Sequence, residues 1–159
     1  VARPVVVDVT SDDTARMLKA AVGQGFDIVL ANKRPLADTR DGYEQLVNAC
    51  GASGRQLRYE TTVGAGLPII DTYRKLAESG DRVLRIHGCV SGTLTYVLSE
   101  VSAGRLFSAA VKEAMTRGYA EPDPRDDLSG RAAARKGLIL ARMMGYRGAP
   151  PAADDLVPA

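Results

Sequence analysis

The hydrophobic pattern of residues 5–30 constrains the fold of this chain more than any other feature. The run VVVDV at residues 5–9 is nearly continuous in β-branched residues, which is typical of a strand buried on both faces of a sheet. Apolar residues then recur at helical spacing from Ala15 to Val22, and residues 26–30 have the pattern of a second strand. A strand, a helix and a strand joined by short connections form a βαβ unit. The pattern therefore predicts a parallel sheet with a right-handed crossover.

The rest of the chain is expected to continue with further helices and strands. Loops rich in Gly, Pro and Asp separate these elements, and the loop at residues 119–130 has no apolar periodicity. The predicted fold class is α/β, with a partial Rossmann-type parallel sheet followed by an α+β region. The further helices are expected at residues 43–50, 68–76, 94–101, 108–118 (with Ser108 as N-cap) and 131–144, and the further strands at 56–63 and 82–90.

The composition is that of an ordinary globular protein and excludes several classes of function. Hydrophobic residues make up 45% of the 159 residues and charged residues 25%, with a formal net charge of +2. Lysine and arginine are spread along the chain and tryptophan is absent, so we expect no nucleic-acid partner. No apolar stretch approaches the roughly 20 residues that cross a bilayer, so we expect no membrane association. The two cysteines, Cys50 and Cys89, form no CxxC motif, which favours a reduced, cytoplasmic setting.

Two polar residues, Thr10 and Lys33, follow neighbouring strands of the expected sheet. In an open parallel sheet, ligands bind beyond the carboxyl ends of the strands, so both residues are expected to face one crevice. Lys33 is suited to contact a phosphate or a ribose–nicotinamide group, and an exposed basic loop is the alternative interpretation. The glycine pairs at residues 23–25 and 64–66 are not dinucleotide fingerprints, because isoleucine stands where the third glycine belongs.

Charged side chains mark two further candidate sites. Glu60 precedes a Gly-rich loop, where a carboxylate and backbone carbonyls could bind a hard cation, and an ordinary turn is the alternative. A loop held between prolines crowds carboxylates that could bind a metal or an ammonium group, or could simply face solvent. The helix after this loop carries Lys136, and a lysine near several carboxylates is a candidate proton-transfer group. The crowded carboxylates are Glu121, Asp123, Asp126 and Asp127.

Read together, these segments resemble homoserine dehydrogenase, particularly the form fused to aspartate kinase. The matching stretches occur in the family's order over nearly the whole chain, and GYAEPDPRDDLSG at residues 118–130 is highly specific. The chain opens at Val1 without an initiator Met, which we interpret as a cut through a larger protein. The other matching stretches are VVVDVTS (5–11), ANKRPLA (31–37), YETTVGAGLPII (59–70), GCVSGTLTYVLSE (88–100) and ARKGLILAR (134–142).

The resemblance implies an oxidoreductase that converts L-homoserine reversibly to L-aspartate 4-semialdehyde with NAD or NADP. This reaction is a step toward threonine and methionine, and its substrate is a small amino acid. The substrate-domain strands would form a sheet that also builds a homodimer. The implied domains are the C-terminal part of a nucleotide-binding Rossmann domain (1–37), a substrate-binding and dimerisation domain (38–147), and a linker or severed continuation (148–159).

The resemblance also implies roles for individual residues. Lys136 would transfer the hydroxyl proton, Asp127 would be a second catalytic residue, and Glu121 is suited to the α-ammonium group of the substrate. The cofactor would contact Thr10, Ser11, Lys33, Gly118 and Glu121. The substrate would contact Thr93, Tyr119, Glu121 and Asp127. A monovalent cation, sodium or potassium, would bind Glu60 and the carbonyls of Val63, Ala65 and Leu67.

The chain departs from the family pattern in two places. The glycine fingerprint and the first βαβ unit of the family would lie upstream of Val1, so the chain alone is expected to bind cofactor poorly. The family has an Asp four residues before the catalytic lysine, where this chain has Ala132. Residues i and i+4 are neighbours on a helix, so that carboxylate would orient Lys136 and contact substrate.

Three other functions compete with an active dehydrogenase. One is an inactive substrate and dimerisation module of the same family, which the Ala132 substitution favours. Another is a receiver-like signalling module, suggested by Asp8 and Lys33 after neighbouring strands. A related semialdehyde dehydrogenase is the third, and it needs an activated cysteine such as Cys89 beside His87. A mid-strand position favours core packing for that pair instead.

Overall fold

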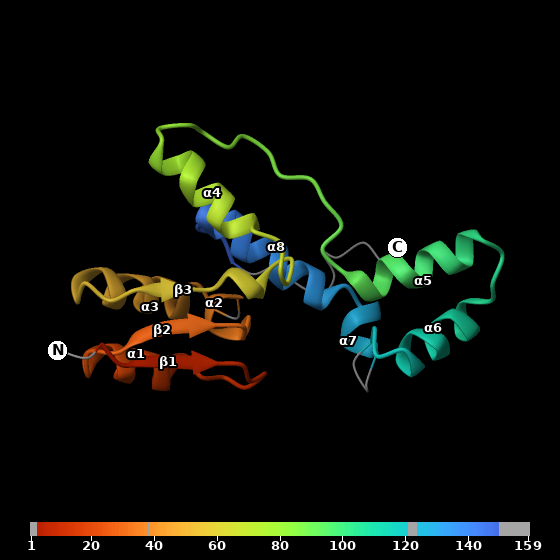
Figure 1. Cartoon of the computed structure of the whole chain (residues 1–159), viewed down its shortest axis with the longest axis horizontal. Coiled ribbons are helices and arrows are strands. Elements are labelled where there is room, and N and C mark those ends of the chain that lie inside the picture. The colour runs from red at the N-terminus through yellow and green to blue at the C-terminus, as the bar shows by residue number, and fades with distance from the viewer. Residues whose placement is uncertain (1–2, 38, 121–123, 150–159) are drawn as a thin grey trace. The chain divides into compact units, whose positions relative to one another are not determined.

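The computed structural model describes residues 3–37, 39–120 and 124–149. The chain divides into two compact units, each described here by itself. The first unit comprises Val1–Ile86 and Arg135–Pro150, and the second includes His87–Ala134 (Figure 1). The expected domain boundaries after residues 37 and 147 stay predictions.

A three-stranded parallel sheet organises the first unit, with strand order β1-β2-β3. Val5 pairs with Asp27 and Asp8 pairs with Leu30, so β1 and β2 are in register along their whole length. The predicted βαβ unit is therefore confirmed, and with it the α/β class. The elements that build this sheet are β1 (Val5–Asp8), α1 (Ala15–Gly23), β2 (Asp27–Leu30), α2 (Arg34–Ala37), α3 (Arg40–Ala52) and β3 (Leu57–Arg58).

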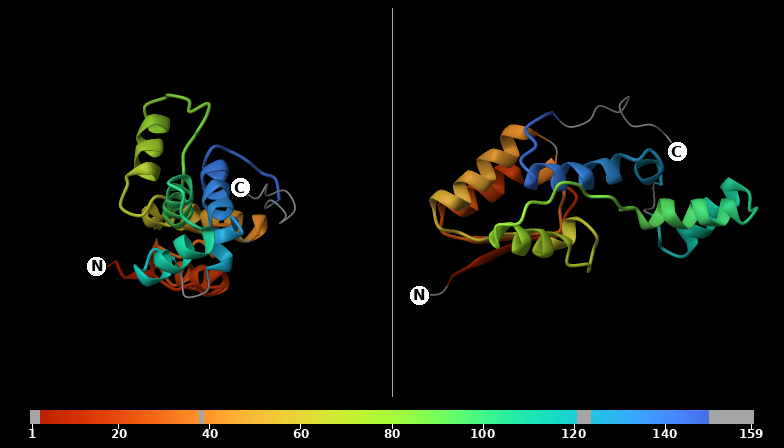
Figure 2. Two further views of the ribbon diagram at one scale, coloured as in Figure 1. Left: turned by 90° about the vertical axis from the view of Figure 1, so that its right-hand side faces the viewer. Right: turned by 90° about the horizontal axis from the view of Figure 1, so that it is seen from above.

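The core of the first unit lies between this sheet and two helices. Figures 1 and 2 show α1 and α3 together on one face of the sheet. On that face Ile28 and Leu30 are buried, whereas Val5 and Val7 on the opposite face are 51% and 60% exposed. The expectation that residues 5–9 form a strand buried on both faces is therefore wrong, because the described helices cover only one face of β1.

Two other predicted strands differ from the structure. Only Leu57–Arg58 of the expected strand at 56–63 pairs with β2, and the chain then enters a 3₁₀ turn, η1 (Glu60–Thr62). Residues 82–90 form no regular element. A strand needs a neighbouring strand to receive its backbone hydrogen bonds, and the described residues supply none for this segment. The α4 helix (Ile69–Glu78) before it begins after Pro68, as predicted.

The second unit is helical in its described part. Ser91 caps α5 (Gly92–Ser102) by accepting a hydrogen bond from the Leu94 N–H. α5 packs against α6 (Phe107–Thr116) around Val97, Ala110 and Ala114. Ser108 lies inside α6 rather than at its N-cap, so that prediction is wrong, whereas Gly118 follows the helix end as expected.

A short helix interrupts the acidic loop, which was expected to be irregular. This helix, α7 (Arg125–Leu128), precedes α8 (Arg131–Met143), which confirms the last predicted helix. α8 begins in the second unit and ends in the first. No helix of the described residues has the length and apolar character that crossing a membrane requires.

Candidate active site

The carboxyl end of β1 carries a buried carboxylate, that of Asp8, which is 3% exposed. Its Oδ1 accepts hydrogen bonds from the backbone N–H and the hydroxyl of Thr10, at 2.9 and 2.8 Å. Its Oδ2 accepts from the Thr14 hydroxyl at 2.5 Å and from the Asn32 amide at 3.0 Å. Thr10 and Thr14 lie in the loop after β1, and Asn32 lies two residues after the end of β2. The carboxylate therefore ties the two loops at this edge of the sheet together.

Asn32 is the second centre of this network and is itself 3% exposed. Its amide also donates to the Asp12 carbonyl at 2.8 Å and approaches the Thr14 hydroxyl at 3.2 Å. Its Oδ1 accepts from the backbone N–H of Arg34 at 3.1 Å, at the first residue of α2. Lys33 lies between Asn32 and Arg34, so the network fixes the backbone on both sides of this lysine.

The hydrogen bonds also decide the charge of Asp8. Burial by itself raises the pKa of the carboxyl, but the donors from Thr14, Thr10 and Asn32 outweigh burial and hold that pKa below its ordinary value. The carboxylate is therefore ionised near neutral pH. Because it is enclosed and its oxygens are occupied, it is a poor phosphoryl acceptor, which weakens the signalling-module interpretation.

The predicted cofactor residues of the first unit lie at this edge of the sheet. The amide of Asn32 reaches the Thr10 hydroxyl at 3.4 Å, so the loops bearing Thr10 and Lys33 are in contact. Thr10 and Ser11 are exposed and Lys33 is half-buried. Thr10 and Lys33 thus lie at the same edge of the sheet, and the expectations that they face one crevice and contact a cofactor stay predictions.

Glu60 takes part in a turn that the sequence did not reveal. Its carboxylate oxygens accept the backbone N–H groups of Ile70 at 2.9 Å and Asp71 at 2.8 Å, so Glu60 caps the first turn of α4. Gly64 and Ala65 adopt positive φ angles of 79° and 50° in the intervening loop. The φ of Gly64 strains any residue with a side chain, and a Cβ there would also lie 2.3 Å from the Ile69 Cδ1 atom, so glycine is favoured at this position.

The donor set proposed for a cation is partly available in this turn. Among the described residues, no donor bonds to the carbonyl oxygens of Val63 or Ala65, whereas the Leu67 carbonyl accepts from the Ile69 N–H at 2.8 Å. Both Glu60 oxygens keep a lone pair beyond the backbone bonds that they accept. These oxygen ligands fit a hard monovalent cation, and their coordination of one stays a prediction.

The second unit brings three predicted residues together. The Thr93 hydroxyl, on a side chain that is 7% exposed, donates to the Tyr119 carbonyl at 2.6 Å. Gly118 ends α6 with a φ of 71° and immediately precedes this carbonyl. The Tyr119 ring is 50% exposed and meets Tyr96 edge-on, with centroids 5.1 Å apart. Thr93, Gly118 and Tyr119 thus form one local cluster, whose ligand contacts stay predictions.

The acidic loop is described only in part, whereas Lys136, the predicted proton-transfer residue, lies in a described helix. Glu121 and Asp123 lie outside the described residues, and Asp127 lies in α7. Lys136 and Ala132 both lie in α8, so the expected spacing of one helical turn is confirmed. Lys136 belongs to the first unit, and Asp127 and the Thr93 cluster belong to the second. Among the described residues, no group of three His, Cys, Asp or Glu side chains could hold a metal.

The two cysteines lie in different surroundings. Cys50 is buried, and burial together with Asp27 raises the pKa of its thiol. Cys89 is exposed, lies in a segment without regular structure, and places its sulfur 2.9 Å from the Thr95 hydroxyl. His87 and Cys89 therefore do not share a strand face, and the semialdehyde-dehydrogenase interpretation loses its support.

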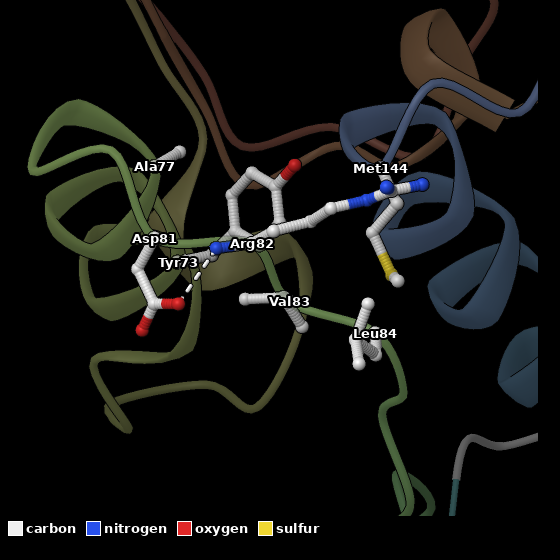
Figure 3. Close-up of a pocket in the computed structure, with 7 residues that line it drawn as sticks. All are labelled: Tyr73, Ala77, Asp81, Arg82, Val83, Leu84 and Met144. Atoms are coloured by element: carbon white, nitrogen blue, oxygen red, sulfur yellow. Dashed lines mark hydrogen bonds between the residues drawn. The ribbon is translucent and has the colours of Figure 1, made fainter.

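One cavity of the first unit lies away from all the predicted site residues. It has a volume of about 240 Å³, and in Figure 3 Arg82 extends across it toward Met144. The Tyr73 hydroxyl donates to the Met143 carbonyl at 2.7 Å beside it, which ties α4 to the end of α8. Arg82 donates its backbone N–H to the Asp81 carboxylate at 2.7 Å.

Comparison with known proteins assigns the chain to a family. The model of the homoserine dehydrogenase NAD-binding domain matches residues 1–60, and the model of homoserine dehydrogenase matches residues 68–154. Bifunctional aspartokinase/homoserine dehydrogenase 2 of Zea mays is 46% identical over 90% of this chain and 16% of its own length. Homoserine dehydrogenase of Paracoccidioides brasiliensis is 39% identical over 99% of this chain and 45% of its own length.

A solved structure of a relative agrees with this assignment. A hyperthermophilic archaeal homoserine dehydrogenase in complex with NADPH superposes with a TM-score of 0.81 at 34% identity, over 90% of this chain and 44% of the other. The chain spans less than half the length of each of these relatives. The matched models together cover both of its halves, and the chain belongs to the homoserine dehydrogenase family.

Proposed function

We propose that this chain serves the homoserine dehydrogenase reaction, in which L-homoserine and NAD or NADP react reversibly to L-aspartate 4-semialdehyde. A bound nicotinamide would accept the hydride from the hydroxyl-bearing carbon, and a base of this chain would accept the hydroxyl proton. The observation that carries the proposal is the ordered edge at which Thr10 and Lys33 follow parallel strands, in a chain of this family. Such an edge is where dinucleotides bind in open parallel sheets.

The cofactor and substrate groups divide between the two units. Thr10, Ser11 and Lys33 would hold the nicotinamide cofactor, and the Gly118 backbone and Glu121 would complete its contacts. Thr93, Tyr119, Glu121 and Asp127 would hold the amino acid. The neutral amine of Lys136 would accept the hydroxyl proton as the hydride leaves, with Asp127 as the second catalytic residue, and would return the proton in the reverse direction.

The test is reduction of NADP+ by L-homoserine with the full chain, followed by the absorbance of the reduced nicotinamide. Lys136→Ala should lower kcat by roughly 10²- to 10⁴-fold, because a positioned general base contributes about that much. Lys112→Ala, which removes an exposed lysine of α6, is the matched control and should leave the rate unchanged. Equal rates for Lys136→Ala and the parent chain would contradict the proposal.

The alternative function is an inactive substrate and dimerisation module, and Ala132 is the observation that favours it. Ala132 lies one helical turn before Lys136 in α8, where a carboxylate could orient the lysine. If that carboxylate is required, the parent chain should bind L-homoserine without turnover, and Ala132→Asp should produce NADP+ reduction. Full activity of the parent chain would exclude the alternative.

A monovalent cation, sodium or potassium, is the second proposed ligand, held by Glu60 and by the carbonyls of Val63, Ala65 and Leu67. The turn supports this because the φ angles of Gly64 and Ala65 set the direction of successive carbonyls. The thermal midpoint should be higher in KCl or NaCl than in tetramethylammonium chloride of equal ionic strength. Glu60→Gln should abolish that difference and Glu78→Gln, an exposed change in α4, should keep it.

We also propose a homodimer in which residues 82–90 pair with a second copy. The exposure of Leu84 at 79% and Ile86 at 41%, in a segment with no regular structure, supports this. Sedimentation should give a dimer for the parent chain and a monomer for Leu84→Asp. Leu106→Asp, at a site that is 76% exposed in the second unit, should remain dimeric.

The proposed metabolic role is a step toward threonine and methionine in the cytoplasm. Two free cysteines support a reducing compartment. The related bifunctional enzymes from Zea mays and Arabidopsis thaliana are themselves chloroplastic proteins. Fractionation of the source cells with an antibody against this chain would test the location.

A further inference from the structure

We infer that Asp8 and Asn32 are positioning residues for the nicotinamide cofactor, and that their buried pair sets where Thr10 and Lys33 meet it. The inference rests on the proposed function and deepens it. Neither side chain is accessible enough to bind a ligand itself, since each is 3% exposed. They act through the loops that they join, so they are not catalytic residues.

The pair couples the loop after β1 to the segment after β2. Asp8 holds the loop after β1 through Thr10 and Thr14, and Asn32 holds the same loop through the Asp12 carbonyl. The Asp8–Asn32 bond of 3.0 Å then joins that loop to the segment after β2. A buried, satisfied polar network fixes one geometry, because any other arrangement leaves a donor or acceptor unpaired.

The segment that bears Lys33 is held at both of its ends. Asn32 Oδ1 receives the Arg34 N–H where α2 begins, and the buried Arg142 guanidinium donates to the Leu36 carbonyl near its end. The Lys33 carbonyl accepts the Leu36 N–H at 3.1 Å between these anchors. The Lys33 backbone is therefore fixed while its side chain stays half-buried at the sheet edge.

The network also determines which charges surround Lys33. The Asp8 carboxylate is balanced by neutral donors and by no cation, and within the described residues Lys33 forms no ion pair. The network thus positions Lys33 without neutralising it. A lysine held in this way presents its positive charge to an anionic or electron-rich group, which a nicotinamide dinucleotide supplies in its phosphates and ribose.

The chemistry of the pair suggests a reciprocal exchange as the test. Asp8→Asn keeps the shape of the side chain, but it can direct an amide N–H₂ at the N–H₂ of Asn32, so two donors face each other. Asn32→Asp instead brings two carboxylates to that distance. The double variant Asp8→Asn/Asn32→Asp restores one donor opposite one acceptor, although the bond to the Asp12 carbonyl stays lost.

The matched control lies at the other end of the same strands. Asp27 begins β2 and accepts hydrogen bonds from the Gln56 N–H and from Arg3, far along the strand from Lys33. Asp27→Asn therefore makes the same chemical change in the same sheet without touching the loops after β1 and β2. It separates an effect on positioning from a general effect of losing a carboxylate.

The experiment measures NADPH binding by the full chain through the fluorescence of the reduced nicotinamide, with L-homoserine binding measured separately by calorimetry. Asp8→Asn should raise the Kd for NADPH at least about tenfold, which is about 1.4 kcal/mol. The affinity for L-homoserine should be unchanged. The reciprocal double variant should recover part of the loss, and Asp27→Asn should bind as the parent chain does.

The outcomes separate this inference from the proposed function. If the parent chain does not bind NADPH, the proposed cofactor use fails and the inference fails with it. If the parent chain binds NADPH and folded Asp8→Asn binds it equally well, only the inference is overturned. Should Asp8→Asn not fold, Thr14→Val decides, because it removes one donor to Asp8 and should weaken NADPH binding about threefold. Unchanged binding by Thr14→Val would then overturn the inference.

Discussion

Two carboxylates stand at opposite ends of the same pair of parallel strands and are stabilised in different ways. Asp8 closes β1 and is 3% exposed, with hydrogen bonds from hydroxyl, amide and backbone donors. Asp27 opens β2 and bonds to the Gln56 N–H at 2.8 Å and to the half-exposed Arg3 guanidinium at 2.9 Å. The pKa of Asp27 is held below its ordinary value first by the Gln56 N–H and then by Arg3.

The difference shows where this fold needs precision. At the amino end of the strands an ion pair with solvent access joins the chain start to the sheet, and such pairs contribute little to stability. At the carboxyl end, where ligands bind in parallel sheets, the carboxylate is enclosed and its donors are neutral and directional. Neutral buried donors fix geometry independently of salt, whereas an exposed pair is screened.

The largest expected effect comes from removing the buried carboxylate. Asp8→Ala leaves the Thr14 hydroxyl, the Thr10 N–H and the Asn32 amide without their acceptor, so the free energy of unfolding should fall by about 3 kcal/mol. Urea unfolding followed by far-UV circular dichroism measures it. A loss below about 1 kcal/mol, with an unchanged m-value, would mean that the network contributes little.

A smaller loss is expected when only one donor is removed. Thr14→Val keeps the volume of the side chain and deletes the hydroxyl that bonds to Asp8 at 2.5 Å. Hydrogen bonds to charged groups contribute about 1.5–3 kcal/mol, and the lower part of that range applies because the other donors to Asp8 remain. The same urea titration checks it, with Thr116→Val in the second unit as a control that bonds only within its helix.

The next effect concerns how the free energy of unfolding decreases at acidic pH in the parent chain and in Asp8→Asn. A carboxyl whose pKa is lower in the folded than in the unfolded state stabilises the fold at pH values above its unfolded-state pKa, which is near 3.9 for Asp. This stabilisation is lost as the pH falls through the folded-state pKa. Asp8 and Asp27 both have lowered pKa values, so stability should fall below about pH 4. In Asp8→Asn that fall should be shallower. Urea midpoints between neutral and acidic pH give the slope, and an identical slope in both proteins would contradict it.

The sequence predicted the sheet well because its signals are local. The β-branched run at residues 5–9, the periodic residues up to Val22 and the pattern at 26–30 each depend on neighbours in the chain. The confirmed elements β1, α1 and β2 follow from these patterns. The prediction that β1 is buried on both faces was wrong, because such burial depends on what covers the second face of the sheet and no local pattern reports that.

The expected strand at residues 82–90 failed for a related reason. Its residues favour a strand, but a strand exists only through pairing, and the described chain gives it no partner. Glu60 illustrates the same limit on a smaller scale. Its carboxylate caps α4 ten residues later in the chain, and only the folded turn brings these groups together.

The candidate site was predicted in part. Thr10 and Lys33 were placed at one edge because both follow strands of a parallel pair, and that rule is topological. The buried pair of Asp8 and Asn32 was not predicted as a network. The sequence did offer one signal for it, namely the charged Asp8 near the end of an otherwise apolar strand. A carboxylate enclosed in this way needs several hydrogen-bond donors, and the polar residues Thr10 and Thr14 follow in the loop after the strand.

The smallest expected effect belongs to Asp27, whose partner Arg3 is half-exposed, and its salt dependence sharpens the contrast. Asp27→Asn removes the charge that attracts Arg3 but keeps an oxygen for the Gln56 N–H, so its loss of stability should be far smaller than that of Asp8→Ala. Urea titrations at low and high NaCl should show the Asp27→Asn difference shrinking toward zero as salt screens the pair. The Asp8→Ala difference should stay constant, because its partners carry no charge. Equal salt dependence in the two variants would show that the two ends of the sheet are stabilised in the same way.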